Sequence, residues 1–264
     1  LGKDLIHIPN GTIDFRGKNV LTMKQSDLLD LRRSGVSMIS QSPMSALNPV
    51  FTIGQQLMDI LKYSGKYNPR DKEALKNAAH EALTSVMLSD PDRIMASYPH
   101  QLSGGMRQRV MIAIALACGP KLLIADEPTT ALDVTIQAQL LDLLGRIREQ
   151  SGMSVILVTH DLGVVASFAQ RVQVMYAGQI VERGTVEDIF KRPRHPYTWA
   201  LLSSLPQLGI KGEELFSIKG TPPNLFTPIH GDAFAARNPQ ALKIDFVERP
   251  PYFEVSPTHK AKTW

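Results

Sequence analysis

The sequence predicts an α/β protein built on a parallel β-sheet. The segments 122–125 and 155–158 are apolar throughout, as in strands that are buried on both sides, and the segment 36–39 has the pattern of a buried strand. Segments with helical periodicity separate them, and parallel strands need such crossover connections. We therefore expect a parallel sheet covered by helices on both faces.

The remaining elements follow from periodicity and from residues that end helices. Between residues 52 and 97 the pattern is helical, with Ile53, Leu57 and Leu61 on one face. Ser103 is a natural N-cap for a helix that begins at about Met106. We further expect a strand-like piece at 12–15, a helix at 136–150 ended by Gly152, and a hairpin of 172–176 and 179–183 around Ala177-Gly178.

Composition changes near the C-terminus. From Pro193 onward prolines are dense and long periodic helices disappear, which predicts a separate, loop-rich appendage. The predicted organisation is a core of residues 1–51 and 98–192, a helical subdomain of 52–97, and a C-terminal extension of 193–264.

Bulk properties narrow the class of protein. The 264 residues carry a formal charge of +4, which is too small and too dispersed to indicate nucleic-acid binding. The single cysteine, Cys118, allows no disulfide within the chain and fits a reducing cytoplasm. The apolar run that ends there falls short of the roughly 18 residues of a membrane span, and no signal peptide is visible at the start. We expect a soluble protein that reaches a membrane only through a partner.

Polar residues end each of the three predicted strands. Gln41 follows the first, Asp126 and Glu127 end the second, and His160 ends the third. Ligands of open parallel sheets bind beyond the carboxyl ends of the strands, so these side chains are candidates to meet at one site. Taken singly, Gln41 could be a loop residue, Asp126 a cap and His160 the start of a helix.

Nucleotide hydrolysis is the chemistry that fits these residues. Asp126 could hold Mg²⁺, which prefers oxygen ligands, and Glu127 could polarise the attacking water. Gln41 could sense metal and water, while His160 could hydrogen-bond the γ-phosphate. The Ser103-Gly-Gly105 helix start could bind an anion through free backbone N–H groups, although such starts are also common without a ligand.

These segments together resemble the motifs of ATP-binding cassette (ABC) ATPases. Leu102-Ser-Gly-Gly-Met-Arg-Gln-Arg109 resembles the signature motif, with Met106 where Gln is more usual, and Leu122-Leu-Ile-Ala-Asp-Glu-Pro128 resembles the Walker B strand with its catalytic glutamate. Ala131-Leu-Asp133 resembles the D-loop, Gln41 the Q-loop glutamine and His160 the switch histidine. The resemblance implies an ABC-type nucleotide-binding domain that uses ATP and Mg²⁺. It implies catalytic roles for Glu127, His160 and Gln41, metal binding by Asp126 and Gln41, and nucleotide contacts from Ser103, Gly104, Gly105 and Asp133.

Other segments resemble the oligopeptide and dipeptide importers of this family. They are Ser40–Pro49, Tyr98–Gln101, Arg194–Thr198 and Gly220–Leu225. Some relatives hold an iron–sulfur cluster on cysteines of the C-terminal extension. Gly231–Asn238 contains Asp232 and Asn238 but no cysteine, so no such cluster is expected in this chain.

The resemblance also implies partners. A second ATP-binding subunit would pair head to tail, so that each signature motif faces the partner's nucleotide. The pair would drive membrane permease subunits, contacted through residues 52–97 and fed by an extracellular peptide-binding protein. The subunit would then lie peripherally on the cytoplasmic face of the cell membrane.

One expected motif is absent from the 264 residues. A phosphate-binding loop has the pattern Gly-x-x-x-x-Gly-Lys-Ser/Thr, and the Gly-Lys pairs at Gly2, Gly17 and Gly65 do not match it. The expectation is an N-terminally incomplete core that is inactive alone, with a gap in the sheet and an unstable or rearranged fold. A naturally non-catalytic subunit that completes a partner's site is the alternative. A nucleic-acid-directed ABC ATPase is a remote third.

Overall fold

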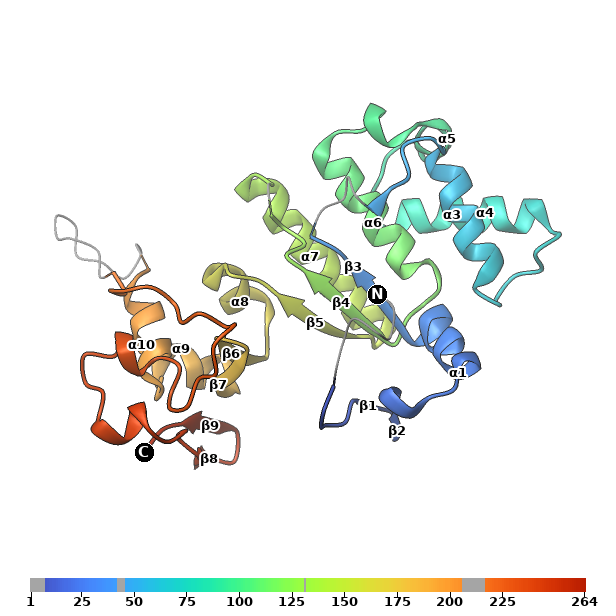
Figure 1. Ribbon diagram of the computed structural model, residues 1–264. Coiled ribbons are helices and arrows are strands. Elements are labelled where there is room, and N and C mark those ends of the chain that lie inside the picture. Colours follow the sequence, from blue (N-terminus) through green and yellow to red (C-terminus); the bar gives the residue numbers. More distant parts are fainter. Residues whose placement is uncertain (1–7, 42–45, 131, 206–216) are drawn as a thin grey trace. The chain divides into compact units, whose positions relative to one another are not determined.

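The computed structural model describes residues 8–41, 46–130, 132–205 and 217–264. Ala131 of the D-loop segment and residues 42–45 of the Q-loop segment lie outside this description. The chain divides into two compact units, Leu1–His160 (unit 1) and Asp161–Trp264 (unit 2), which are described separately (Figure 1).

Unit 1 is built on a parallel sheet in the order β3-β4-β5. The strands are β3 (Val36–Ile39), β4 (Leu122–Asp126) and β5 (Ser154–Val158). Their register is in phase, because Met38 lies beside Ile124 and Ile124 beside Ile156. All three predicted strands are confirmed, and Asp126 is the last residue of β4.

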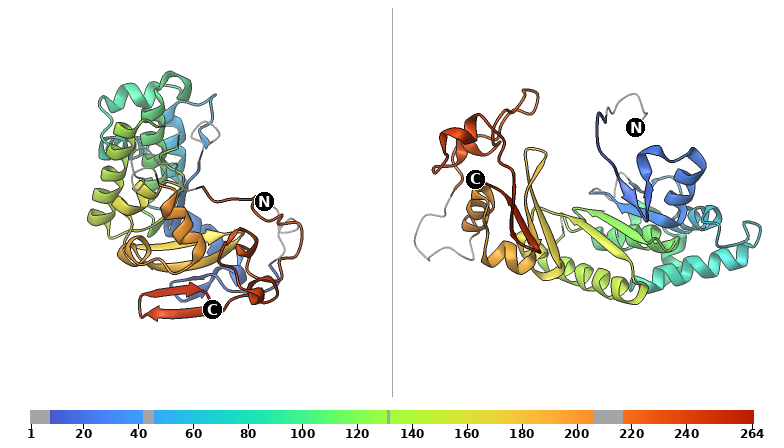
Figure 2. Two further views of the ribbon diagram at one scale, coloured as in Figure 1. Left: turned by 90° about the vertical axis from the view of Figure 1, so that its left-hand side faces the viewer. Right: turned by 90° about the horizontal axis from the view of Figure 1, so that it is seen from below.

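The two faces of this sheet differ. Ile39, Leu123 and Ala125 share one face and are fully buried. α6 (Gly104–Ala117) contacts β3, and α7 (Val134–Ser151) runs along the sheet in both Figures 1 and 2. On the opposite face Met38 is 56% exposed and Ile156 49% exposed. The expectation that both faces are covered is therefore wrong for unit 1, because continuous apolar strands do not reveal which elements cover them.

A group of helices packs with α6. They are α3 (Ile53–Tyr63), α4 (Lys72–Ser85) and α5 (Pro91–Ala96), which confirms the predicted helical pattern between 52 and 97. The Ser103 hydroxyl accepts a hydrogen bond from the Met106 N–H, so the predicted N-cap is confirmed. The helix starts at Gly104, two residues earlier than expected, because the capped N–H belongs to its third residue.

Asp133 caps α7 and Gly152, at φ 64°, ends it. The rest of unit 1 consists of short elements: β1 (Asp14–Phe15), β2 (Lys18–Asn19), the 3₁₀ helices η2 (Val20–Thr22) and η4 (Pro99–Gln101), α1 (Gln25–Asp30) and the π-helix η3 (Leu31–Gly35).

Unit 2 contains an antiparallel sheet in the order β6-β7-β9-β8. Its strands are β6 (Arg171–Tyr176), β7 (Gln179–Thr185), β8 (Tyr252–Ser256) and β9 (His259–Lys262). The predicted hairpin of β6 and β7 is confirmed, and Ala177 and Gly178 both adopt positive φ, as tight hairpin turns require. The helices are α8 (Leu162–Phe168), α9 (Val186–Lys191), α10 (Pro196–Ser203), η6 (Ala235–Arg237) and η7 (Lys243–Phe246).

Residues 193–264 are joined to the hairpin and do not form a separate appendage. β9 pairs with β7 in one sheet, and Phe234 is buried in a core with Tyr176 and Ile189. The division found in the structure, after His160, differs from the boundary placed at 192/193 from composition. Proline density marks irregular backbone but does not show where that backbone packs.

Glu182 of β7 holds both ends of this extension. Its fully buried carboxylate accepts hydrogen bonds from the backbone N–H groups of Arg194 (2.7 Å) and His195 (3.1 Å). It also lies 2.7 Å from Nε2 of the buried His259. Pairing and hydrogen bonds of this kind offset the free energy that is lost when a carboxylate is removed from water.

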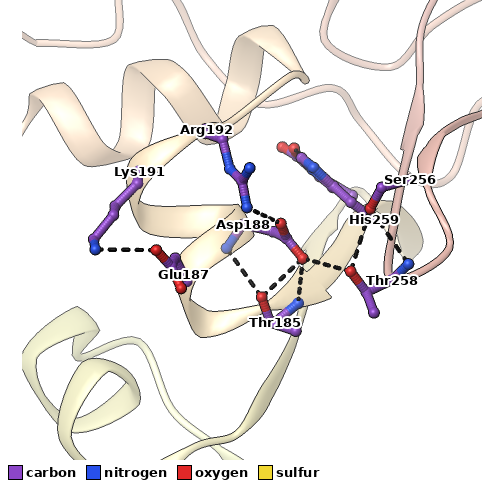
Figure 3. A network of polar contacts seen from close by, with 9 residues as sticks. Thr185, Glu187, Asp188, Lys191, Arg192, Ser256, Thr258 and His259 are labelled. Atoms are coloured by element: carbon purple, nitrogen blue, oxygen red, sulfur yellow. Dashed lines mark hydrogen bonds and ion pairs between the residues drawn. The ribbon is translucent and has the colours of Figure 1, made fainter.

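A second carboxylate extends the network (Figure 3). Asp188 accepts hydrogen bonds from the hydroxyls of Thr185 (2.8 Å) and Thr258 (3.0 Å) and pairs with Arg192 (2.9 Å). The Thr185 hydrogen bonds are the main reason that the pKa of Asp188 falls to about 2. The carboxylate therefore stays ionised, and it links β7, α9 and the turn before β9.

Gly231 provides a test of packing in unit 2. A Cβ at this position would lie 2.0 Å from the backbone oxygen of Asp245. We expect Gly231→Ala to lower the free energy of unfolding of unit 2 by about 2 kcal/mol or more, because backbone has to move. Both tryptophans, Trp199 and Trp264, lie in unit 2, so urea unfolding followed by tryptophan fluorescence reports on it. Gly145→Ala, whose Cβ meets nothing within 4 Å in unit 1, is the matched control and should leave this transition in place.

The buried His195 makes unit 2 sensitive to acid. Burial lowers the pKa of His195 to about 4, whereas an unfolded histidine titrates near 6.5. Between these values the unfolded state binds more protons, so the free energy of unfolding should fall by up to about 3 kcal/mol as the pH drops from 6.5 to 4. His195→Asn keeps an acceptor for the Tyr197 N–H but removes the proton uptake. Its unfolding midpoint, measured by tryptophan fluorescence, should depend less on pH over this range. If the midpoint of His195→Asn depends on pH as strongly as that of the unaltered protein, His195 is not the group responsible.

Candidate functional site

The candidate site is formed by the turn that follows β4. Glu127 has a left-handed backbone, φ 45°, and its N–H donates to the carbonyl oxygen of Val158 in β5 at 2.8 Å. Pro128 cannot donate a ladder hydrogen bond, so the strand stops there. The N–H of Thr130 returns to the Glu127 oxygen and closes the turn.

Three side chains converge on the carboxylate of Glu127. Its Oε2 accepts hydrogen bonds from Gln41 Nε2 (3.0 Å) and Thr130 Oγ1 (2.8 Å). Its Oε1 lies 2.8 Å from His160 Nδ1. Gln41 follows β3 and His160 follows β5, so the in-phase parallel strands bring these residues from positions far apart in the sequence to one edge.

This arrangement keeps Glu127 ionised. The hydrogen bond from His160 is the main reason that the pKa of this carboxyl is lowered, and the Thr130 hydroxyl adds to the effect. Since a carboxylate only accepts, Nδ1 of His160 carries the proton in this contact. The His160 side chain is 77% exposed, and its Nε2 remains for another partner.

Asp126 lies next to this cluster, at the end of β4. Its carboxylate has no hydrogen bond or ion pair to any of the residues that the structure describes. Gln41 donates its amide N–H to Glu127 and keeps its Oε1 as an acceptor. Two such oxygens fit part of a Mg²⁺ shell. Across the described ranges no three His, Cys, Asp or Glu side chains form a metal-binding group, so phosphate oxygens and waters would have to complete it.

Within the described part of the chain, Ser103, Gly104 and Gly105 form no hydrogen bond with the residues of the Glu127 cluster. Ser103 and Gly104 are exposed at the start of α6, where a Cβ on Gly104 would meet nothing within 4 Å. Asp133 uses its side chain to cap α7, with Oδ1 2.9 Å from the Ile136 N–H. The predicted site residues thus form one cluster around Glu127 and a second group at the helix starts.

Two residues of this region received no role from the sequence, although Gln108 lies within the segment that resembles the signature motif. Thr130 follows Glu127 by three positions, a spacing that allows a side chain to reach back across a turn. Gln108 is only 3% exposed, and its Nε2 donates to the Pro128 carbonyl at 2.6 Å. No sequence signal connects Gln108 to a residue 20 positions later.

Comparison with known proteins agrees with these motifs. Residues 4–130 match the ABC transporter family, and residues 181–244 match the oligopeptide/dipeptide transporter C-terminal region. The dipeptide transport ATP-binding protein DppD of Lactococcus lactis is 54% identical over 258 residues, which cover 97% of this chain and 73% of that protein. The oligopeptide transport ATP-binding protein OppD of Bacillus subtilis is 52% identical over 259 residues, 98% of this chain and 72% of that protein.

This chain is an ATP-binding subunit of the oligopeptide/dipeptide ABC importers. It spans nearly three quarters of the length of these relatives. Among solved structures, the dimeric ATP-binding cassette MJ0796 in a post-hydrolysis state with ADP and phosphate has a TM-score of 0.61 and 28% identity, over 69% of this chain and 76% of that one. The predicted ABC fold class is confirmed.

Membership in this family identifies the activity of the intact subunit, which is an ATPase that energises oligopeptide uptake. ABC cassettes of this kind bind ATP, dimerise and work with membrane permease components. Over the described residues, no helix of this importer subunit has both the length and the apolarity of a membrane span.

The environment of Glu127 can be tested without nucleotide. We expect His160→Ala to raise the pKa of Glu127, and Thr130→Val to raise it by less, because each variant removes a hydrogen bond to the charged form. Carbon-detected NMR of the glutamate carboxyl groups during a pH titration measures the shift. His100→Ala removes another exposed histidine that has no hydrogen bond to Glu127. If this control raises the pKa of Glu127 as much as His160→Ala does, the hydrogen bond from His160 is not the cause of the lowered pKa.

Proposed function

We propose that Glu127 is the general base for ATP hydrolysis in this importer subunit. The observation that carries the proposal is the convergence of Gln41, Thr130 and His160 on its carboxylate. A carboxylate held ionised can accept a hydrogen bond from a water and orient a lone pair of that water toward the γ-phosphorus. The new P–O bond then forms as the bond to the ADP oxygen breaks, and the water's proton moves to Glu127.

His160 and Gln41 take supporting roles in this proposal. With Nδ1 held by Glu127, His160 can offer Nε2 to a γ-phosphate oxygen, provided that the ring carries both protons. Gln41 and Asp126 would hold Mg²⁺, which neutralises phosphate charge when bound. Ser103, Gly104, Gly105 and Asp133 would contact the nucleotide of a head-to-tail partner.

The remaining proposals concern partners and location. A depression of about 230 Å³ lies between α3, α4 and α6, lined by Leu61, Tyr67, Ala78, Glu81, Ala82, Ser85, Ala113, Leu116 and Ala117. Its small apolar side chains could admit a helix of a permease subunit, which would place this subunit on the cytoplasmic face of the membrane.

Peptides would reach that permease from an extracellular binding protein, and nothing in this proposal involves nucleic acid.

ATP turnover tests the catalytic role. We expect negligible turnover from the 264 residues alone, which contain no phosphate-binding loop pattern, and clear turnover when a segment with that pattern precedes them. Glu127→Gln should then lower kcat by about 10²-fold or more. Glu149→Gln, at an exposed glutamate of α7, is the matched control and should leave kcat unchanged.

Each part of the proposal can fail separately. Substantial turnover by the 264 residues alone would contradict the need for the phosphate loop. Turnover that survives Glu127→Gln would contradict the role of Glu127. The alternative of a non-catalytic subunit predicts no Glu127-dependent turnover in any form, while a partner's turnover still requires Ser103.

A further inference from the structure

Gln108 is a buried amide in the helix that carries the signature motif. It is 3% exposed, and the neighbouring buried positions of α6 are apolar, among them Val110, Met111 and Ile112. An apolar side chain of similar length would fill the same space without needing a partner. The amide uses its donor on the Pro128 carbonyl at 2.6 Å, so the hydrogen bond rather than core packing explains glutamine here.

The group that accepts this hydrogen bond belongs to the turn that places Glu127. Proline has no N–H, so the carbonyl is the only backbone hydrogen-bonding group of Pro128. Glu127 is anchored on its other side by the Val158 carbonyl of β5. The turn, with its left-handed Glu127, is therefore held between β5 and α6.

The same helix positions the signature residues. Ser103 caps α6 five residues before Gln108, and one rigid helix separates them. Gly105 lies against α7, where an added Cβ would come within 3.3 Å of Ile136. The helix that begins at the signature residues is therefore joined to the Pro128 carbonyl by the Gln108 hydrogen bond.

We propose that Gln108 is a positioning residue that couples the signature motif to Glu127 of the same chain. The inference rests on the proposed function, in which Ser103 faces a partner's nucleotide and Glu127 acts on the chain's own. Gln108 then joins two half-sites that serve different ATP molecules. It acts through the Glu127 turn and touches neither nucleotide.

The test uses the importer assembled in lipid vesicles, with the ATP-binding subunit preceded by a segment that has the phosphate-binding loop pattern. The subunit is otherwise unaltered or carries Gln108→Met, which keeps the length of the side chain and removes the donor. We expect kcat for ATP to fall 10- to 100-fold while KM changes less than twofold. Gln150→Met makes the same change at an exposed position of α7 and should leave both values unchanged. In a Glu127→Gln background, Gln108→Met should lower the residual turnover less than twofold, since both changes act on one step.

Gln108→Glu provides a second variant that keeps the shape of the side chain. The introduced carboxyl can donate to the Pro128 carbonyl only when it is protonated, so the ratio of its kcat to that of the unaltered subunit should rise as the pH falls. A merely structural role would instead lower kcat by the same factor when Gln108→Met is made in either Glu127 background. A kcat for Gln108→Met equal to that of Gln150→Met, or the same loss in both Glu127 backgrounds, would overturn the inference. If Glu127→Gln alone leaves turnover unchanged, the result contradicts the proposed function of Glu127 and not only the role of Gln108.

Discussion

The in-phase parallel register of β3, β4 and β5 is the constraint on which the candidate site depends. Because the three strands run in one direction and end at one edge, Gln41, Glu127 and His160 meet there although 119 positions separate the first from the last. A register shift of one residue would turn the side chains of a strand to the opposite face. The buried face, with Ile39, Leu123 and Ala125, fixes the register because these side chains have no other place to be buried.

The turn after β4 concentrates the unusual features of unit 1. A left-handed backbone at a non-glycine residue costs on the order of 1–3 kcal/mol and persists only where its surroundings impose it. Here the Val158 carbonyl, the Thr130 hydroxyl and the Gln108 amide impose it on Glu127 and Pro128. The strained residue is Glu127, whose carboxylate has to point away from β4 toward the ends of β3 and β5.

Unit 2 depends on buried carboxylates in a comparable way. Glu182 binds groups from both ends of the C-terminal extension and Asp188 binds Thr258 near its end, so the extension packs against the hairpin through charge as well as through the Phe234 core. The Glu182 carboxylate can be buried without a large loss of folding free energy because its oxygens accept hydrogen bonds. The loop-rich composition after Pro193 is thus compatible with a folded unit whose sequence contains no cysteine.

The sequence by itself determined the strands of the parallel sheet, the helical pattern of 52–97, the N-cap at Ser103, the hairpin at Ala177-Gly178 and the membership in a peptide-importer family. These features depend on local periodicity, on turn residues and on short motifs. Only the tertiary structure decided that one face of the β3-β4-β5 sheet is exposed in unit 1, that Thr130 and Gln108 support Glu127, and that β9 pairs with β7. Such contacts join residues up to 79 positions apart, and a single hydrogen bond between distant polar side chains leaves no periodic trace in the sequence.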